Sequence, residues 1–359
     1  YRSDASTCAL KGASSNWYGY THGTDPDFEG PSTWRGNLKL DMLTASGYDI
    51  SLEYNRDTVR KDVDFKDYSY SERSVLADGR PVTSSRENTY ITNTTFGGGY
   101  SFTTAVQKGF ENGVEFYFGY TNMEQRDVAA MTSAQHSSSY GYQPRGYGEI
   151  VPAARSSFMN EHKFVLALSY TTQIIGDNDT TFSLLGIRKS GEPHSITFGG
   201  DSFNGSGRDG YDLAYIPTGV NDPNVVFASA DVANEVMAFV NSKGCISAYA
   251  GTIIPRNTCD NPWQGRIDLR ITQDINLVGD HKAIVYLDIT NLLNLIDDDK
   301  GIVREYSNRS RQIILDEDNP YDSQGRYNIV GVDPDDGLFV YNRDGQSSYQ
   351  WNLGFKYQF

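Results

Sequence analysis

The last residues of the chain decide the fold: Ser347-Ser348-Tyr349-Gln350-Trp351-Asn352-Leu353-Gly354-Phe355-Lys356-Tyr357-Gln358-Phe359. Large apolar side chains occupy every second position, namely Tyr349, Trp351, Leu353, Phe355, Tyr357 and Phe359, and the positions between them are polar or glycine. A period of two predicts a β-strand with two different faces. In water the aromatic face is an aggregation hazard, whereas the lipid around a membrane β-barrel requires it. The pattern therefore favours a lipid-facing strand over the edge strand of a soluble β-sandwich.

The same alternation recurs along the whole chain. Apolar or small residues alternate with polar ones from Trp34 to Met42, and after a turn that ends at Gly47 the alternation resumes from Tyr48 to Tyr54. Two alternating runs joined by a short glycine-containing turn indicate a β-hairpin. The pattern predicts nine strands, at about residues 34–43, 48–66, 88–107, 114–128, 160–172, 180–199, 263–275, 281–294 and 347–359.

Short and long connections alternate between these strands. The long connections cover about residues 57–88, 122–160, 200–262 and 295–346 and hold most of the Asp, Asn, Ser, Gly and Pro. Tight turns on one side and long polar loops on the other are typical of outer-membrane barrels. We therefore expect an all-β, antiparallel transmembrane β-barrel, with extracellular loops at 1–33, at 200–262 with a short helix near Asp231–Val240, and at 295–346, which is acidic.

The composition excludes several other classes of protein. The chain has 31 Lys+Arg and 46 Asp+Glu, a formal net charge of −15, and 13% aromatic residues. So many aromatic residues argue against a disordered chain, and the scattered positive residues argue against a nucleic-acid partner. The longest apolar runs have the length of a strand, so no membrane-spanning helix is expected.

An ordered set of short motifs resembles one known family. The motifs are Asp27–Trp34, Arg188–Pro193, Ala214–Gly219, Asp222–Asn224, Pro255–Cys259, Pro262–Arg270, Asp288–Asn294 and the terminal aromatic strand. Together they make residues from about 27 to 359 resemble the C-terminal part of the β-barrel of a TonB-dependent outer-membrane receptor of the Oar-like group. Each motif alone has low specificity, and the resemblance depends on their common order.

The resemblance implies a receptor that binds an extracellular ligand and imports it with energy supplied through TonB. It implies a closed barrel of about 22 strands around a plug, of which this chain would supply about nine C-terminal strands. We expect the plug, the TonB-binding segment and any export signal to lie outside this sequence. The expected partners are outer-membrane lipid and lipopolysaccharide, the barrel-assembly machinery that recognises a terminal Phe such as Phe359, TonB, and an unidentified ligand. The alternatives are a passive porin and a surface β adhesin.

Cysteine usage points to an oxidising compartment. Cys245 and Cys259 flank a short polar loop, whereas Cys8 stands alone. We expect one disulfide, between Cys245 and Cys259, and such bonds persist in a periplasm or outside the cell.

The sequence contains no catalytic signature, and we expect neither an enzyme nor a required cofactor. The five histidines lack metal-ligand spacing, and no phosphate loop or nucleophile elbow is present. Clustered carboxylates suit Ca²⁺, so Asp297, Asp298 and Asp299, with Asp335 and Asp336, are candidate ligands. The alternative is a solvated acidic loop that faces lipopolysaccharide.

The period of two also assigns side chains to the two faces of the sheet. We expect Leu38, Leu52, Phe116, Leu166, Leu269 and Trp351 to face lipid, and Lys39, Glu53, Arg270 and Lys356 to face the lumen.

Overall fold

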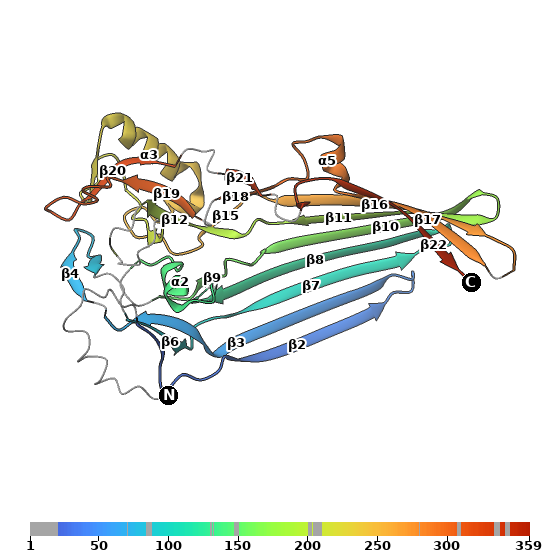
Figure 1. The fold of residues 1–359 in the computed structure, drawn as a ribbon, viewed down its shortest axis with the longest axis horizontal. Coiled ribbons are helices and arrows are strands. Elements are labelled where there is room, and N and C mark those ends of the chain that lie inside the picture. Colours follow the sequence, from blue (N-terminus) through green and yellow to red (C-terminus); the bar gives the residue numbers. More distant parts are fainter. Residues whose placement is uncertain are drawn as a thin grey trace.

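The structure is a computed structural model that describes residues 21–69, 71–83, 88–129, 131, 133–146, 151–199, 203, 210–279, 281–306, 310–333, 338–341 and 345–359. The chain is mostly β, with 56% strand and 9% helix, which confirms the predicted fold class at that level. A large sheet of long strands forms one body, and smaller elements gather at one end of it (Figure 1).

Long antiparallel strands form the large sheet, and each pairs with the one that precedes it in the meander. They are β2 (Ser32–Leu43), β3 (Asp49–Asp67), β7 (Gly98–Gly109), β8 (Val114–Asp127), β10 (His162–Ile175), β11 (Asn178–Lys189), β16 (Gln264–Asn276), β17 (Lys282–Thr290) and β22 (Gln350–Gln358). Each corresponds to one predicted strand. The short turns lie together at one end of the sheet with the C-terminus, and the long connections lie at the other end (Figure 1). Gly47 and Gly113 supply the positive φ angles, 78° and 82°, that two of these turns need.

Three predicted strands are shorter than expected. Residues 88–107 divide into β6 (Asn88–Thr94) and β7, because Gly97, which lies between them, has a φ angle of 131° that regular strand backbone does not adopt. Residues 180–199 divide into β11 and β12 (Pro193–Gly199), and β12 leaves the large sheet. Residues 281–294 end their strand at Thr290, where Asn291 adopts a left-handed φ of 58° before the short helix α5 (Leu292–Ile296).

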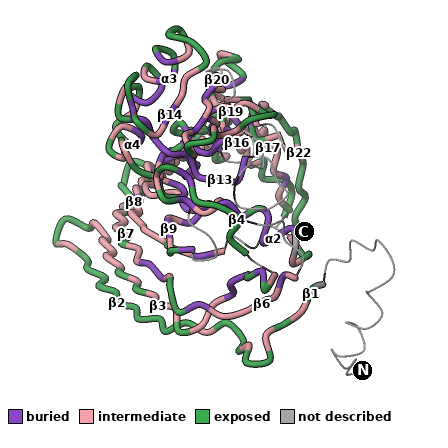
Figure 2. The backbone as a smooth tube through the Cα atoms, turned by 90° about the vertical axis from the view of Figure 1, so that its left-hand side faces the viewer, coloured by how far each residue is buried: buried purple, intermediate pink, exposed green. Residues whose placement is uncertain are grey.

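The large sheet is open among the described residues. Strand β2 pairs with β3 and strand β22 with β17, and neither has a partner on its other edge in the described part of the chain. The sheet is also mixed, because β1 (Thr21–Thr24) is parallel to β6. Seen along the strands, it follows a curved path around α2 (His136–Gly141) and β9 (Ala154–Arg155) (Figure 2). No closed barrel is present in the described residues.

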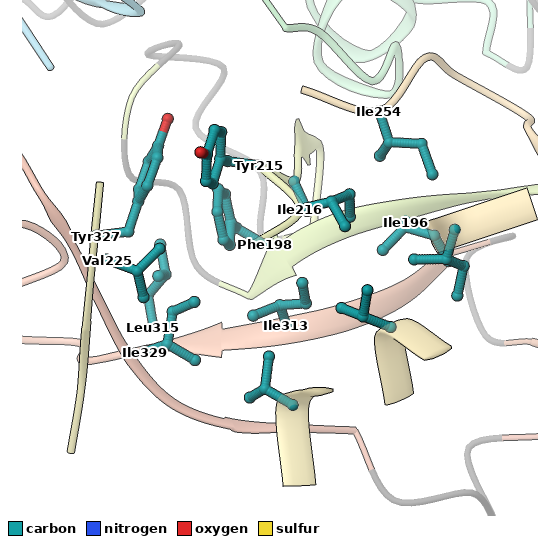
Figure 3. Close-up of a cluster of buried hydrophobic side chains, with 14 of the residues drawn as sticks. Ile196, Phe198, Tyr215, Ile216, Val225, Ile254, Ile313, Leu315, Tyr327 and Ile329 are labelled. Atoms are coloured by element: carbon teal, nitrogen blue, oxygen red, sulfur yellow. The ribbon is translucent and has the colours of Figure 1, made fainter. Parts of the chain in front are cut away.

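The two longest connections fold together, which the prediction of separate loops at 200–262 and 295–346 missed. A second, mixed sheet contains β12, β13 (Asp212–Leu213), β14 (Val225–Phe227), β15 (Cys259–Asp260), β19 (Ser310–Leu315) and β20 (Tyr327–Val332). With the helices α3 (Ala230–Ser242) and α4 (Gly244–Ser247) these strands form what we call the loop module. Its core contains Ile196, Phe198, Tyr215, Ile313 and Tyr327 (Figure 3).

Helix α3 packs inside this module. Its N-terminus is capped by Ser229, whose hydroxyl oxygen accepts a hydrogen bond from the Val232 amide at 3.2 Å. Val236, Phe239 and Val240 are buried in the module. The helix predicted near residues 231–240 is therefore present, and it belongs to a packed core.

The remaining short strands are β4 (Glu72–Val75), β5 (Pro81–Thr83), β18 (Val303–Tyr306) and β21 (Leu338–Tyr341).

Candidate functional site

The large sheet has two faces of opposite chemistry, and strand register defines them. Directly paired residues share a face, and one such row runs across six strands: Phe116, Leu168, Leu184, Leu269, Ile289 and Trp351. Leu38, Tyr54 and Phe102 extend the same side over the first three strands. We call this side the apolar face.

All side chains that the sequence assigned to lipid share the apolar face. By strand alternation Leu38, Leu52, Phe116, Leu166, Leu269 and Trp351 lie on it, and Lys39, Glu53, Arg270 and Lys356 lie on the opposite side. The sequence therefore predicted correctly which side chains share a face of the sheet.

The apolar face is most exposed on the two edge strands. Relative exposure is 73% for Leu38 on β2 and 64% and 70% for Trp351 and Leu353 on β22, whereas Phe116, Leu184, Leu269 and Ile289 on the inner strands are half-buried. Soluble monomers rarely leave such large, continuous apolar surfaces in contact with water. This face therefore requires an apolar environment or a large partner surface.

The same apolar row also shows that the strands are staggered. The row passes Phe116, next to a short turn, and reaches Ile289 and Trp351 beside the long connections. A row of paired residues can move from one end of a sheet to the other only when successive strands shift in register. Such a stagger is the geometry that closed barrels use.

The opposite side is hollowed, and charged and polar side chains there stand among apolar ones. A trough of about 980 Å³ is lined by residues that include Glu115, Ser169, Asp268, Arg270 and Asp288. Arg270 donates to both carboxylate oxygens of Asp288, at 2.5 and 2.7 Å, and Ser169 donates to Glu115 at 3.2 Å. Such paired charges are typical of a hydrated surface, so the trough can accommodate water and polar solutes.

The terminal strand lies on the apolar face. Four of its predicted apolar residues pair with residues of β17, in the register Trp351–Ile289, Leu353–Leu287, Phe355–Val285 and Tyr357–Ala283. Tyr349 and Phe359 flank the strand, and Phe359 is 94% exposed at the end of the sheet that carries the short turns. Its role in assembly stays a prediction.

The Cys245–Cys259 disulfide is present in the structure. Its Cα atoms are 5.5 Å apart, and it joins α4 to β15 within the loop module. Cys8 lies outside the described residues, with residues 1–20 of the predicted first loop.

The acidic candidates do not assemble into a metal site among the described residues. The Asp297 carboxylate lies 3.1 Å from the Lys300 ammonium and accepts a hydrogen bond from the Asp299 amide. These two contacts, Lys300 first, lower the pKa of Asp297. In the described part of the chain no three His, Cys, Asp or Glu side chains are placed to hold a metal ion. Asp335 and Asp336 lie outside it.

Buried arginines in the long connections are a feature that the sequence did not indicate. Arg80 is 1% exposed and lies between the rings of Phe198, Phe203 and Tyr327, at 5.6, 5.3 and 5.6 Å. Arg256 is 4% exposed and contacts Asp127 at 2.6 Å across 129 residues of chain. Contacts between segments so far apart leave no local pattern, so only the fold reveals them.

Comparisons of the chain with protein families, with curated proteins and with solved structures found no match. Among the described residues no helix is both long enough and apolar enough to cross a membrane.

Proposed function

We propose that the large sheet is part of the transmembrane β-barrel of an outer-membrane receptor. The observation that carries this proposal is the continuous apolar face, which extends over the long strands opposite a polar face. Lipid would cover the apolar face, and the polar trough would line the lumen.

Three further features support this arrangement. Several strands, including β3 with 19 residues and β8 with 14, exceed the roughly 9–11 residues that a bilayer requires. The register is staggered as closure demands. The edges of β2 and β22 expose backbone groups that cannot stay unpaired in lipid, so the barrel would be completed by further strands at these edges.

In this proposal the loop module faces the cell exterior, together with the disulfide that an oxidising compartment preserves. The family resemblance adds the mechanism: the receptor captures a ligand on this side and imports it with energy supplied through TonB. The resemblance alone supports that coupling.

Fractionation of cells that produce the protein tests the proposal. We expect the protein in outer membranes, resistant to carbonate extraction, and faster on gels before heating than after it, as intact barrels are. Release into the soluble fraction would contradict the barrel and favour an adhesin. Ligand uptake that persists without TonB would contradict coupled import and favour a passive channel.

A further inference from the structure

A second cavity lies at the end of the sheet that carries the long connections. Its volume is about 460 Å³, within the range of roughly 300–1,000 Å³ that small-molecule sites occupy. Segments 144–146 and 151–155 form one wall, and segment 249–258 forms much of the other. Backbone hydrogen bonds hold this region together, from Leu213 to Arg145 at 2.8 Å and from Ile254 to Ala214 at 3.0 Å.

Part of the cavity wall is apolar. Val151, Leu213 and Ile254 are buried beside it, at 7%, 7% and 0% exposure, and Ile253 and Pro255 add further apolar surface. This wall is suited to an apolar group of a ligand.

The charged groups among the described lining residues all have the same sign. Four arginines, Arg126, Arg145, Arg155 and Arg256, line the cavity, and no Asp or Glu is among the described lining residues. This contrasts with the chain as a whole, whose formal net charge is −15.

Three of these arginines pair with carboxylates, and none of those carboxylates belongs to a described lining residue of the cavity. Arg126 contacts Glu124 at 2.6 Å, and Arg256 contacts Asp127 at 2.6 Å. Arg155 contacts both Glu161 and Asp260, at 3.0 and 2.7 Å. The pairs of Arg256 and Arg155, whose side chains are 3% and 18% exposed, hold these two guanidinium groups in place before any ligand arrives, whereas the pair of Arg126 is exposed to solvent.

One arginine has an unsatisfied donor at this wall. The side chain of Arg256 is 3% exposed, and its Nε has no hydrogen-bond partner among the described residues. A buried donor of a charged group is costly to leave unpaired. This Nε has almost no accessible surface, so it marks a charge that the fold buries beside the cavity, not a donor that faces a ligand.

We propose that this cavity binds a small amphipathic carboxylate, with its anionic group toward the arginines and its apolar group against Val151, Leu213 and Ile254. As a statement about what a receptor captures, the inference rests on the proposed function. Binding itself can be measured on purified protein, so its failure and a failure of outer-membrane location are separate results.

The test uses two probes that share one apolar skeleton, 3-phenylpropanoate and 3-phenylpropanamide. We expect the acid to bind at least about tenfold more tightly than the amide, because only the acid can accept charge-assisted hydrogen bonds. The two affinities are measured by saturation-transfer NMR on the purified protein in detergent. Both probes also partition into detergent. The difference between their two affinities therefore measures the contribution of the arginines.

Three variants locate the site. Ala153 lines the cavity, so Ala153→Glu introduces a competing carboxylate and should weaken acid binding about tenfold or more. Ala153→Gln has nearly the same volume without the charge and should retain most of the binding. Ala248→Glu adds the same charge at an exposed position outside the described lining and should leave the affinity unchanged.

Two results would overturn the proposal: equal affinity for the acid and the amide, or no detectable binding of the acid. Equal effects of Ala153→Glu and Ala248→Glu would also overturn it, because the acid would then bind elsewhere. If Ala153→Gln abolished binding as fully as Ala153→Glu, volume rather than charge would control the cavity, which contradicts the proposed carboxylate.

Discussion

Neighbouring residues on one strand meet opposite surroundings, and Leu168 and Ser169 in the middle of β10 illustrate this. Leu168 belongs to the row on the apolar face, between Phe116 and Leu184. Ser169 lies on the polar side and donates a hydrogen bond to Glu115. The same substitution at the two positions therefore tests the assignment of the faces.

Leu168→Arg should cost about 2–4 kcal/mol of barrel stability, as a charge near the membrane midplane does. Ser169→Arg should cause only a small loss of stability, because its new cation lies beside Glu115. The measurement is the urea midpoint of the protein folded in lipid vesicles. Equal losses in both variants would contradict the orientation of the sheet.

His194 is a buried histidine, and the stability of the folded state depends on its ring staying neutral. It is 0% exposed, neither ring nitrogen has a hydrogen-bond partner among the described residues, and its ring lies 4.7 Å from that of Tyr306. Burial, with smaller contributions from Lys243, Arg311 and Arg155, lowers the pKa of His194 to about 3. The unfolded chain takes up this proton near pH 6.5, so the contribution of neutral His194 to stability is complete above that pH and decreases as the pH falls toward 3.

His194→Phe should therefore reduce the pH dependence of loop-module stability between pH 6.5 and 4. Near-UV circular dichroism can follow thermal unfolding of the module, because its core contains Tyr215 and Tyr327. The control is His281→Phe, at an exposed histidine near a turn of the large sheet, which should leave that dependence unchanged. An unaltered pH dependence in His194→Phe would refute the role assigned to His194.

At the scale of elements, the disulfide restrains the segment that forms one wall of the arginine-lined cavity. Cys245 and Cys259 are 14 residues apart in sequence, and a ring of that size restrains the open chain by about 3 kcal/mol in the entropic description. Thiol titration of denatured protein prepared without reductant should find one reactive cysteine, Cys8. The same titration of the Cys8→Ser variant should find none. Three reactive thiols would show that the bond does not form.

The terminal strand carries the prediction on assembly. Phe359→Asp places a charge beside the apolar face at the end of the sheet, and in the proposed barrel it would also alter the terminal residue that the assembly machinery is expected to recognise. We expect a sharp loss of heat-modifiable protein from outer membranes. Gln358→Asp changes charge one residue earlier, on the polar side, and should be nearly silent. Normal amounts of the Phe359→Asp barrel would refute the lipid-facing interpretation of the strand end.

Local pattern predicted the long strands, because alternation along β2, β10 or β22 directly reflects two different surroundings. It missed the breaks at Gly97 and Asn291, where backbone angles rather than apolar period end a strand. It also missed the loop module, because β12 pairs in parallel with β19, a distant segment with no corresponding local pattern. The arginine-lined cavity was hidden for the same reason, since its walls come from separate connections.

At the scale of the whole molecule, the described residues form a curved, open sheet with one apolar and one polar side and a folded module at one end (Figures 1 and 2). An all-water environment does not suit the apolar side, and an all-lipid environment does not suit the trough. A barrel wall between lipid and a hydrated lumen satisfies both sides, and this is the central claim.

Cysteine labelling along one strand tests that claim most directly. Leu166, Ala167, Leu168 and Ser169 are consecutive in β10, and each is replaced by Cys in a Cys8→Ser background. In intact outer membranes, a water-soluble maleimide should label positions 167 and 169, whereas positions 166 and 168 should react only after the protein is denatured. Equal labelling of all four positions, or labelling of 166 and 168 from water, would contradict the barrel.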